Sequence, residues 1–124
     1  MAKYVDGFVI PIPKKNLEDY KKMAKVGGKV WREHGALDYK ECIGEDLEPD
    51  MGHTGGTSFS KMSKMKDGET IVFAYIVYKS RKHRDQVNAK VMKDPRMNDP
   101  KWHTMMPFSP KRMAYGGFEV IVDA

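Results

Sequence analysis

Residues 70–78, which read TIVFAYIVY, decide the fold of this chain. The stretch carries no charge and is dominated by β-branched and aromatic residues, which predicts a strand. A strand with one wet face alternates apolar and polar side chains, whereas this one is apolar at both parities. We expect one alternate set to face helices, namely Val72, Ala74 and Ile76. The opposite set needs a further layer and comprises Phe73, Tyr75 and Val77.

Toward the N terminus, the pattern predicts two strands separated by a helix. Residues 4–12 are rich in Val, Ile, Phe and Tyr and end among prolines, as a strand does. From Asn16, a candidate N-cap, apolar residues recur every three or four positions as far as Gly35. This spacing predicts an amphipathic helix that ends at a glycine. Residues 36–43 then predict a second strand.

Toward the C terminus, we expect a second helix between two long connections. Residues 44–68 are polar, and within them residues 57–59 could add a short strand. Ser80 can cap a helix that runs to about Lys93, before an Asp-Pro stop. Residues 94–112 form the second connection.

The last strand is predicted at residues 113–122, where Gly116 and Gly117 indicate a bulge or a close backbone approach. The order β, α, β, β, α, β implies an α+β ferredoxin-like sandwich, one domain over residues 1–124. Right-handed crossovers place strands one and three in the centre of an antiparallel sheet, with both helices on one face. Since nothing in the chain covers the other face, we expect a homodimer in which two sheets face each other.

The charge pattern bears on nucleic-acid partners. The net charge is +5, and two basic runs occur at residues 61–66 (KMSKMK) and 79–84 (KSRKHR). Neither run is interleaved with base-stacking aromatics, so we interpret both as solvated faces. An RNA-binding module that stacks bases on sheet aromatics stays open as the alternative function.

Compartment and cofactors follow from what the sequence lacks. Its apolar runs are shorter than the ~20 residues of a membrane span, and its start lacks a signal-peptide apolar stretch. Cys42 is the sole cysteine, and we expect a buried, inert thiol in a cytoplasmic protein without a membrane partner. The four histidines lack metal-site spacing, and no cofactor motif is present, so we expect no metal and no cofactor.

Four unusual strings occur in order along the chain: YVDGFVIPIPKKN (residues 4–16), VWREHGALDYKEC (30–42), HRDQVNAKVMKDPRM (83–97) and MPFSPKRMAYGGF (106–118). In these strings the chain resembles a bacterial family known as DUF1428. The resemblance implies a dimeric α+β barrel of the antibiotic-biosynthesis-monooxygenase-like group, whose small monooxygenases bind substrates inside the barrel. The family has no established activity, so the resemblance bears on the fold more than on the function.

The candidate catalytic residues are Asp6, Glu41 and Tyr75. Strand parity is expected to place them together on the face of Phe73, with Tyr4, Phe8, Tyr39, Tyr115 and Glu119. A carboxylate among aromatic rings has a raised pKa and can act as a general acid or base. The alternative is that these acids form structural ion pairs with arginines, or that a bulge reverses the face.

The candidate ligand-binding residues are Arg84, Arg96, Arg112 and Tyr115. A guanidinium fork holds a carboxylate through two hydrogen bonds, although surface ion pairs explain the same arginines. Methionines near the second connection are interpreted as loop packing: Met92, Met97, Met105, Met106 and Met113. The expected function is to bind or oxidise a small, partly aromatic molecule in the barrel interior.

Overall fold

The strand at residues 70–78 lies inside a four-stranded antiparallel sheet. In the computed structural model it is β3 (Glu69–Tyr78), which pairs with β1 (Tyr4–Pro13) and with β2 (Asp38–Ile43). β4 (Ala114–Glu119) pairs with the other edge of β1, which gives the order β2-β3-β1-β4. The predicted ferredoxin-like sheet with strands one and three in the centre is confirmed. The structure describes residues 1–49, 55–104 and 106–124, with the backbone alone at residues 103 and 104.

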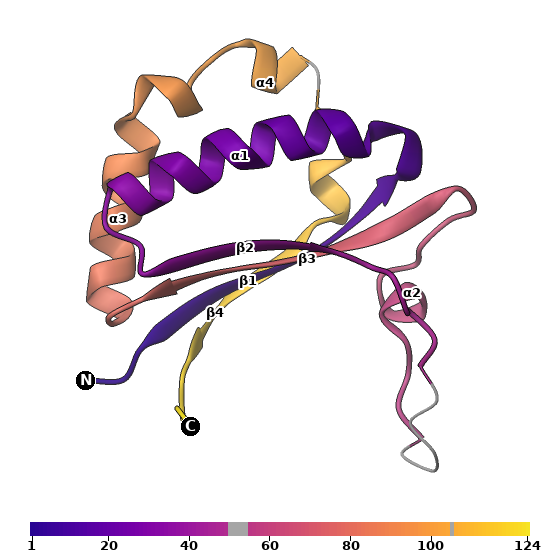
Figure 1. Cartoon of the computed structure of the whole chain (residues 1–124), viewed down its shortest axis with the longest axis horizontal. Helices are drawn as coiled ribbons and strands as arrows, with labels where there is room; N and C mark the ends of the chain where they lie inside the picture. Colours follow the sequence, from indigo (N-terminus) through magenta and orange to yellow (C-terminus); the bar gives the residue numbers. More distant parts are fainter. Residues whose placement is uncertain (50–54, 105) are drawn as a thin grey trace.

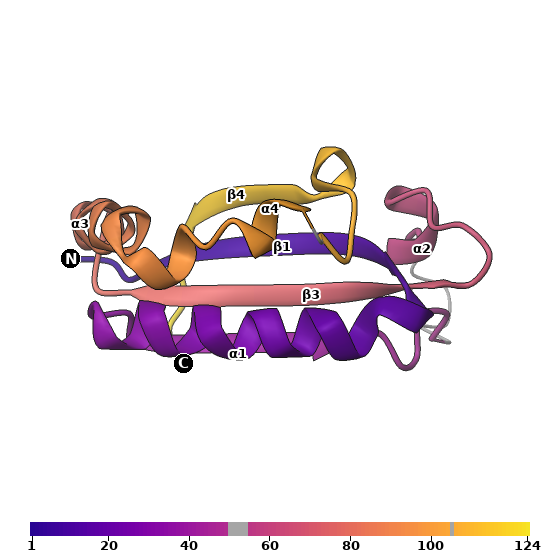
Figure 2. The same ribbon diagram turned by 90° about the horizontal axis from the view of Figure 1, so that it is seen from above.

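Two helices, α1 (Leu17–Glu33) and α3 (Arg81–Lys93), lie on one side of the sheet (Figure 1). Seen from above, α1 runs along β3, and α3 lies at the C-terminal end of β3 (Figure 2). The predicted helix signals at Gly35 and Ser80 are confirmed. Gly35 has a φ of 117°, which favours glycine, and the Ser80 hydroxyl accepts the His83 N–H at 3.1 Å.

The core lies between the helices and the sheet. Around the middle of α1 it comprises Ile10, Ile12, Tyr20, Ala24, Val72 and Ala74. Toward α3 it comprises Val30, Ala36, Ile76, Tyr78, Val87 and Val91. The predicted helix-facing set of β3 is therefore confirmed, while Phe73 on the opposite face is 44% exposed. We call that opposite side the open face.

The second long connection lies on the same side of the sheet as α1 (Figure 1). It forms three short helices, η2 (Pro95–Met97), α4 (Lys101–Thr104) and η3 (Pro110–Arg112). Asn16 ties it to the start of α1, because its side-chain amide donates to the Pro107 carbonyl at 2.9 Å. Asn16 occupies the predicted N-cap position of α1, after the short helix η1 (Lys14–Asn16), but its side chain makes no capping hydrogen bond and anchors this connection instead.

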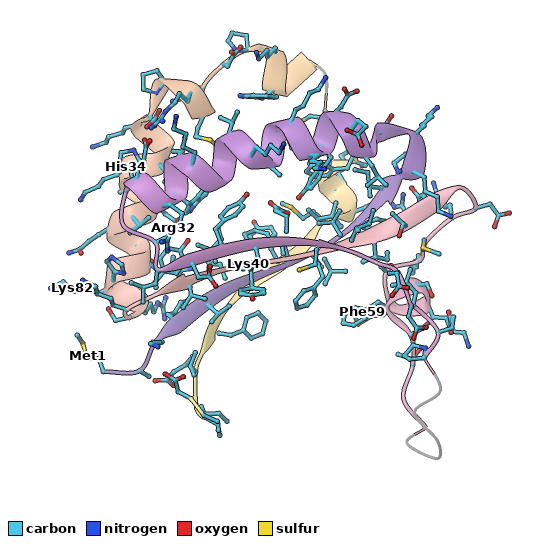
Figure 3. All side chains as sticks on the ribbon, in the orientation of Figure 1. Met1, Arg32, His34, Lys40, Phe59 and Lys82 are labelled. Atoms are coloured by element: carbon cyan, nitrogen blue, oxygen red, sulfur yellow. The ribbon has the colours of Figure 1, made fainter. Side chains whose placement is uncertain are left out.

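A short strand was expected at residues 57–59, and this prediction is wrong. Ser58 is instead the N-cap of α2 (Phe59–Met62), since its hydroxyl accepts the Lys61 N–H at 3.1 Å. α2 lies on the open-face side, and Figure 3 shows Phe59 on the side of the sheet away from α1. The rings of Phe59 and Phe73 meet edge to face at 6.0 Å, so α2 covers one end of the open face.

The ends of the edge strands also differ from the prediction. β2 begins at Asp38 and β4 ends at Glu119, two and three residues short of the predicted limits. Gly116 and Gly117 form no bulge, because the register with β1 is continuous. A β-carbon at Gly117 would collide with the Tyr4 ring, so the close approach is that of a side chain. Among the described helices, none is both long enough and apolar enough to cross a membrane.

Candidate functional site

A cavity of about 300 Å³ lies between α1, the sheet and the second connection. Most of its wall is aromatic or methionine side chains, including Phe8, Met23, Trp31, Tyr39, Trp102 and Phe108. The connection closes one side, where Phe108 meets the Tyr20 ring edge to face at 5.8 Å. Gly27 and Gly28 let the Tyr39 ring lie against α1, since β-carbons there would stand 3.0–3.1 Å from it.

Glu41 is the carboxylate that lines this cavity. Tyr20 of α1 donates its hydroxyl to Oε1, and Tyr39 of β2 donates to Oε2, both at 2.6 Å. Such distances are typical of a hydroxyl that donates to an ionised carboxylate. Burial, followed by the negative charge of Glu41, raises the pKa of both tyrosines far above the usual range. Both hydroxyls therefore stay protonated near neutral pH and hold the carboxylate in place.

Within the described part of the chain, Glu41 forms no ion pair with Lys, Arg or His. An ionised carboxylate has about four acceptor positions, and the two tyrosines occupy two of them. Glu41 is half-buried, so it keeps accepting capacity at the cavity wall. It can therefore take a hydrogen bond or a proton from a bound molecule.

A second hollow, of about 600 Å³, lies on the other side of this carboxylate between α1 and β2. Tyr20, Tyr39 and Glu41 line it as well, so the three side chains form a partition between the two spaces. Lys21, Lys25 and Lys29 line it together with one further acid, Glu18. The two spaces beside Glu41 thus differ in lining: one is charged and mainly basic, and the other is mainly aromatic.

The sheet register contradicts the prediction that Asp6, Glu41 and Tyr75 share one face. Asp6 lies opposite Ile76 and Glu41 lies opposite Ala74, so both acids are on the helix side. The other residues predicted beside them are on that side too: Tyr4, Phe8, Tyr39, Tyr115 and Glu119. The sequence did not show which alternate residues of β1 face the helices, because both alternate sets of β1 are largely apolar.

Tyr75 is on the open face. It lies opposite Gly7 and Lys40, and its ring packs against Phe73 at a centroid distance of 6.4 Å. Tyr75 also borders the cavity that contains Glu41, whereas Asp6 lines neither described cavity. The catalytic role assigned to the three residues stays a prediction, since the structure brings two of them, Glu41 and Tyr75, to one cavity.

Asp6 forms a structural ion pair, which was the alternative interpretation of the candidate acids. The Arg84 guanidinium donates to its carboxylate at 2.7 Å, and both side chains are largely buried. Arg84 also stacks over the Tyr4 ring at 4.9 Å. Asp6 therefore has a cation, whereas Glu41 has two hydroxyl donors.

The arginines predicted to bind an anion each have a carboxylate partner. Arg96 contacts Asp94 at 2.7 Å and Glu33 at 2.8 Å, at the end of α1. Arg112 donates to both oxygens of Glu69, at 2.6 Å and 2.9 Å. None of them lines either cavity that contains Glu41. Their role in ligand binding stays a prediction.

Tyr115 and Cys42 are both exposed to solvent. A role of Tyr115 in ligand binding stays a prediction. Tyr115 is 73% exposed at the edge of the sheet and stacks on Phe8 at 6.3 Å. The prediction of a buried thiol is wrong, because Cys42 is exposed on the open face, opposite Phe73. An edge strand leaves alternate side chains uncovered unless another layer is present.

Some sequence features lie apart from the cavity or outside the description. The two basic runs flank opposite ends of β3, one by α2 and the other at the start of α3 (Figure 1). His53 and Thr54 of the polar connection at residues 44–68, like Met105, lie outside the described residues. Within the described residues no group of three His, Cys, Asp or Glu is arranged to hold a metal ion.

Sequence patterns did not identify Tyr20, Trp31 and Trp102 as site residues. Tyr20 and Trp31 looked like ordinary inward positions of an amphipathic helix, and Trp102 belonged to a connection without periodicity. One signal was available, since Tyr39 and Glu41 are two residues apart on a strand and must share a face.

The fold and this cavity define an α+β sandwich of the ferredoxin-like class with a small internal site. The chain belongs to the family described as "Protein of unknown function (DUF1428)", whose model matches residues 3–110. The predicted family is confirmed.

Relatives agree over nearly the whole length. The chain is 43% identical over 121 residues to "Uncharacterized protein YbaA" of Escherichia coli strain K12, which covers 98% of each chain. The identity to the YbaA protein of Shigella flexneri is the same. A solved structure, a dimeric ferredoxin-like protein from an uncultured marine organism, is 13% identical, with a TM-score of 0.63 over 100% of both chains. That likeness shows the shared fold.

Proposed function

We propose that this protein binds a small, partly aromatic molecule in the cavity between α1 and the sheet, with Glu41 as its polar anchor. The observation that carries the proposal is the Glu41 carboxylate, held by Tyr20 and Tyr39 at 2.6 Å within an aromatic and methionine wall. Ligand sites are typically apolar cavities of ~300–1,000 Å³ with a few oriented polar groups. This cavity has that composition and is at the lower end of that range.

If the bound molecule reacts, Glu41 is the group placed to accept its proton. The hydroxyls of Tyr20 and Tyr39 fix the direction of the carboxylate, which leaves its remaining lone pairs for the ligand. The same contact serves a binding protein that carries out no reaction.

The test uses the two tryptophans of the chain, because both Trp31 and Trp102 line the cavity. A panel of small aromatic compounds is titrated while tryptophan fluorescence is recorded. Binding should change the emission and should shift the ¹³C-methyl NMR signals of Met23 and Met97, which also line the cavity. The signal of Met62, exposed on α2, serves as the control. A panel that moves neither set of signals contradicts the proposal.

The proposed assembly is a homodimer in which the open faces of two sheets meet. Phe73 is 44% and Phe118 is 60% exposed on that face, which favours cover by another apolar surface. The solved structure that shares the fold is described as dimeric. Sedimentation should give twice the chain mass of 14.2 kDa at micromolar concentration. A single-chain mass would contradict the dimer.

An RNA-binding module is the second candidate, because the same exposed rings could stack bases. The two functions exclude each other on this face, since a dimer hides the rings. The basic runs lie at opposite ends of β3, which disfavours a continuous track for a phosphate backbone. A single-chain mass together with RNA binding that Phe73→Ala weakens would favour this second function.

We also propose a cytoplasmic location, because the lone exposed thiol of Cys42 is easiest to keep reduced there. Cell fractionation tests this, and recovery in the periplasm would contradict it.

A further inference from the structure

The charge inside the cavity has one sign. Two charged residues border the cavity, Lys40 and Glu41. The Lys40 side chain lies on the open face opposite Tyr75 and pairs with Asp38 at 2.5 Å. Among the described residues, Glu41 therefore carries the charge that a molecule in the cavity meets.

We infer that the cavity selects a cation, namely a small aromatic amine whose ammonium group donates to Glu41. This inference rests on the proposed function and names the class of ligand. It reverses the sign expected from the sequence, where arginines pointed to an anion. Those arginines are already paired with carboxylates outside the cavity.

The first argument is the state of the carboxylate. Tyr20 and Tyr39 donate hydrogen bonds to Glu41 and bring no positive charge. A half-buried carboxylate gains most from a donor that is itself charged, because charge-assisted hydrogen bonds are about twice as strong as neutral ones. An ammonium group has three donors and can use the acceptor positions that the tyrosines leave. A carboxylic acid anion would be repelled.

The second argument is the composition of the wall. Trp31, Trp102 and Phe108 supply aromatic rings, and Met23 and Met97 supply thioethers. Because the Lys101 ammonium already lies over the Trp102 ring at 5.1 Å, we assign the cation–π contact to Trp31. Tryptophan is the strongest cation–π partner among the side chains, and the attraction increases when water is excluded. The same rings pack against the aromatic part of an amine. The wall therefore suits both ends of the proposed ligand.

The third argument concerns the direction of approach. The hollow between α1 and β2 is bordered by three lysines, Lys21, Lys25 and Lys29, and by one further acid, Glu18. Basic side chains therefore outnumber acidic ones there, which disfavours a cation. Within the described lining of the aromatic cavity, Lys40 is the basic residue, and its ammonium is held on the far face by Asp38. We therefore assign the amine to the cavity beneath the second connection.

Three ligands of nearly equal size separate the possibilities: 2-phenylethylamine, 2-phenylethanol and phenylacetate. Each is titrated into the whole protein at pH 7, with fluorescence of Trp31 and Trp102 as the readout. We expect the amine to bind at least about tenfold more tightly than the alcohol, and the acid to bind most weakly.

The variant Glu41→Gln removes the charge with little change in shape, and Glu45→Gln, exposed beyond β2, is its matched control. Glu41→Gln should weaken the amine about tenfold and leave the alcohol unchanged within a factor of about three. Glu45→Gln should change neither ligand. Circular dichroism checks the fold, and if Glu41→Gln fails to fold, the ranking of the three ligands on the unaltered protein decides.

The two failures are distinguishable. The inference that the ligand is a cation is overturned if the alcohol or the acid binds as tightly as the amine or more tightly. It is also overturned if Glu41→Gln leaves amine binding intact. In both cases the proposal of a binding cavity stands. If these three and the wider aromatic panel all leave the fluorescence and the Met23 signal unmoved, the proposed function itself is overturned, and this inference with it.

Discussion

β3 is apolar on both sides, and its two sides have different environments. Val72, Ala74 and Ile76 are buried against helices of the same chain, while Phe73 is 44% exposed. The helix side also contains the cavity with Glu41, and the open face has the lone thiol of Cys42. Residues 71–78 are thus apolar on both sides for different reasons: one face is needed for folding, and in the proposed dimer the other meets a partner.

The largest difference between the two sides is expected from a charge placed on the helix side. Ala74→Asp buries a carboxylate beside Ile10, Tyr20 and Ala24, at the position opposite Glu41, where the described core supplies no cation. An uncompensated buried charge costs about 3–5 kcal/mol, a large share of a typical unfolding free energy. We expect loss of folded protein, measured by circular dichroism. A folded variant with the wild-type melting temperature would contradict the assignment of this face.

The neighbouring variant Phe73→Asp is the matched test of the open face. If that face meets a second copy, the charge would be buried in the interface, so the dimer should dissociate while each chain keeps its fold. Sedimentation should then give the single-chain mass, with an unchanged circular dichroism spectrum. An unchanged dimer mass would show that another surface makes the interface.

The next effect concerns the buried ion pair between Asp6 and Arg84 on the helix side. Arg84→Met leaves Asp6 buried without its cation and should lower the free energy of unfolding by about 3 kcal/mol. The double variant with Asp6→Asn should recover part of this loss, because the uncompensated charge is gone. Urea unfolding at one fixed protein concentration measures both. Equal stabilities of the single and double variants would mean that the pair is not coupled.

A smaller effect is expected at low pH from Asp94, where α1 meets the second connection. Hydrogen bonds from Arg96 and then from His34 hold the pKa of Asp94 well below its usual range. A carboxylate whose pKa is lower in the folded state than in the unfolded state stabilises the fold when the pH is above its unfolded pKa of ~3.9. This stabilisation is lost as the pH falls toward the folded pKa.

Asp94→Asn should therefore lower the melting temperature at pH 6, and its difference from the unaltered protein should shrink below about pH 4. Asp46→Asn, on an exposed residue beyond β2, is the control and should change little at either pH. A difference for Asp94→Asn that grows as the pH falls would refute the assignment.

The smallest effect concerns the rate at which Cys42 reacts. If the open faces meet, the thiol opposite Phe73 should be alkylated several-fold more slowly in the dimer than in the Phe73→Asp variant. Unfolded protein in urea supplies the reference rate. Equal rates in the dimer and in the variant would place Cys42 outside the interface.

The candidate site was predictable in part. Glu41 was identified from its residue type on a strand, and Tyr39 beside it follows from spacing. The partner Tyr20 is 19 positions before Tyr39 and on another element, so its hydroxyl could be placed at Glu41 only by packing. Tyr75 was assigned to the wrong face for these acids, because parity orders side chains within a strand and leaves the register between strands open.

The sequence by itself determined the element order, the glycine end of α1, the Ser80 cap and the two-sided character of β3, because these depend on local preferences and periodicity. The tertiary structure alone decided that Asp6 would pair with Arg84 while Glu41 would not meet a described cation. It also placed Trp102 over the cavity from a connection with no pattern of its own. These outcomes depend on contacts between residues far apart in the chain, which no local pattern encodes.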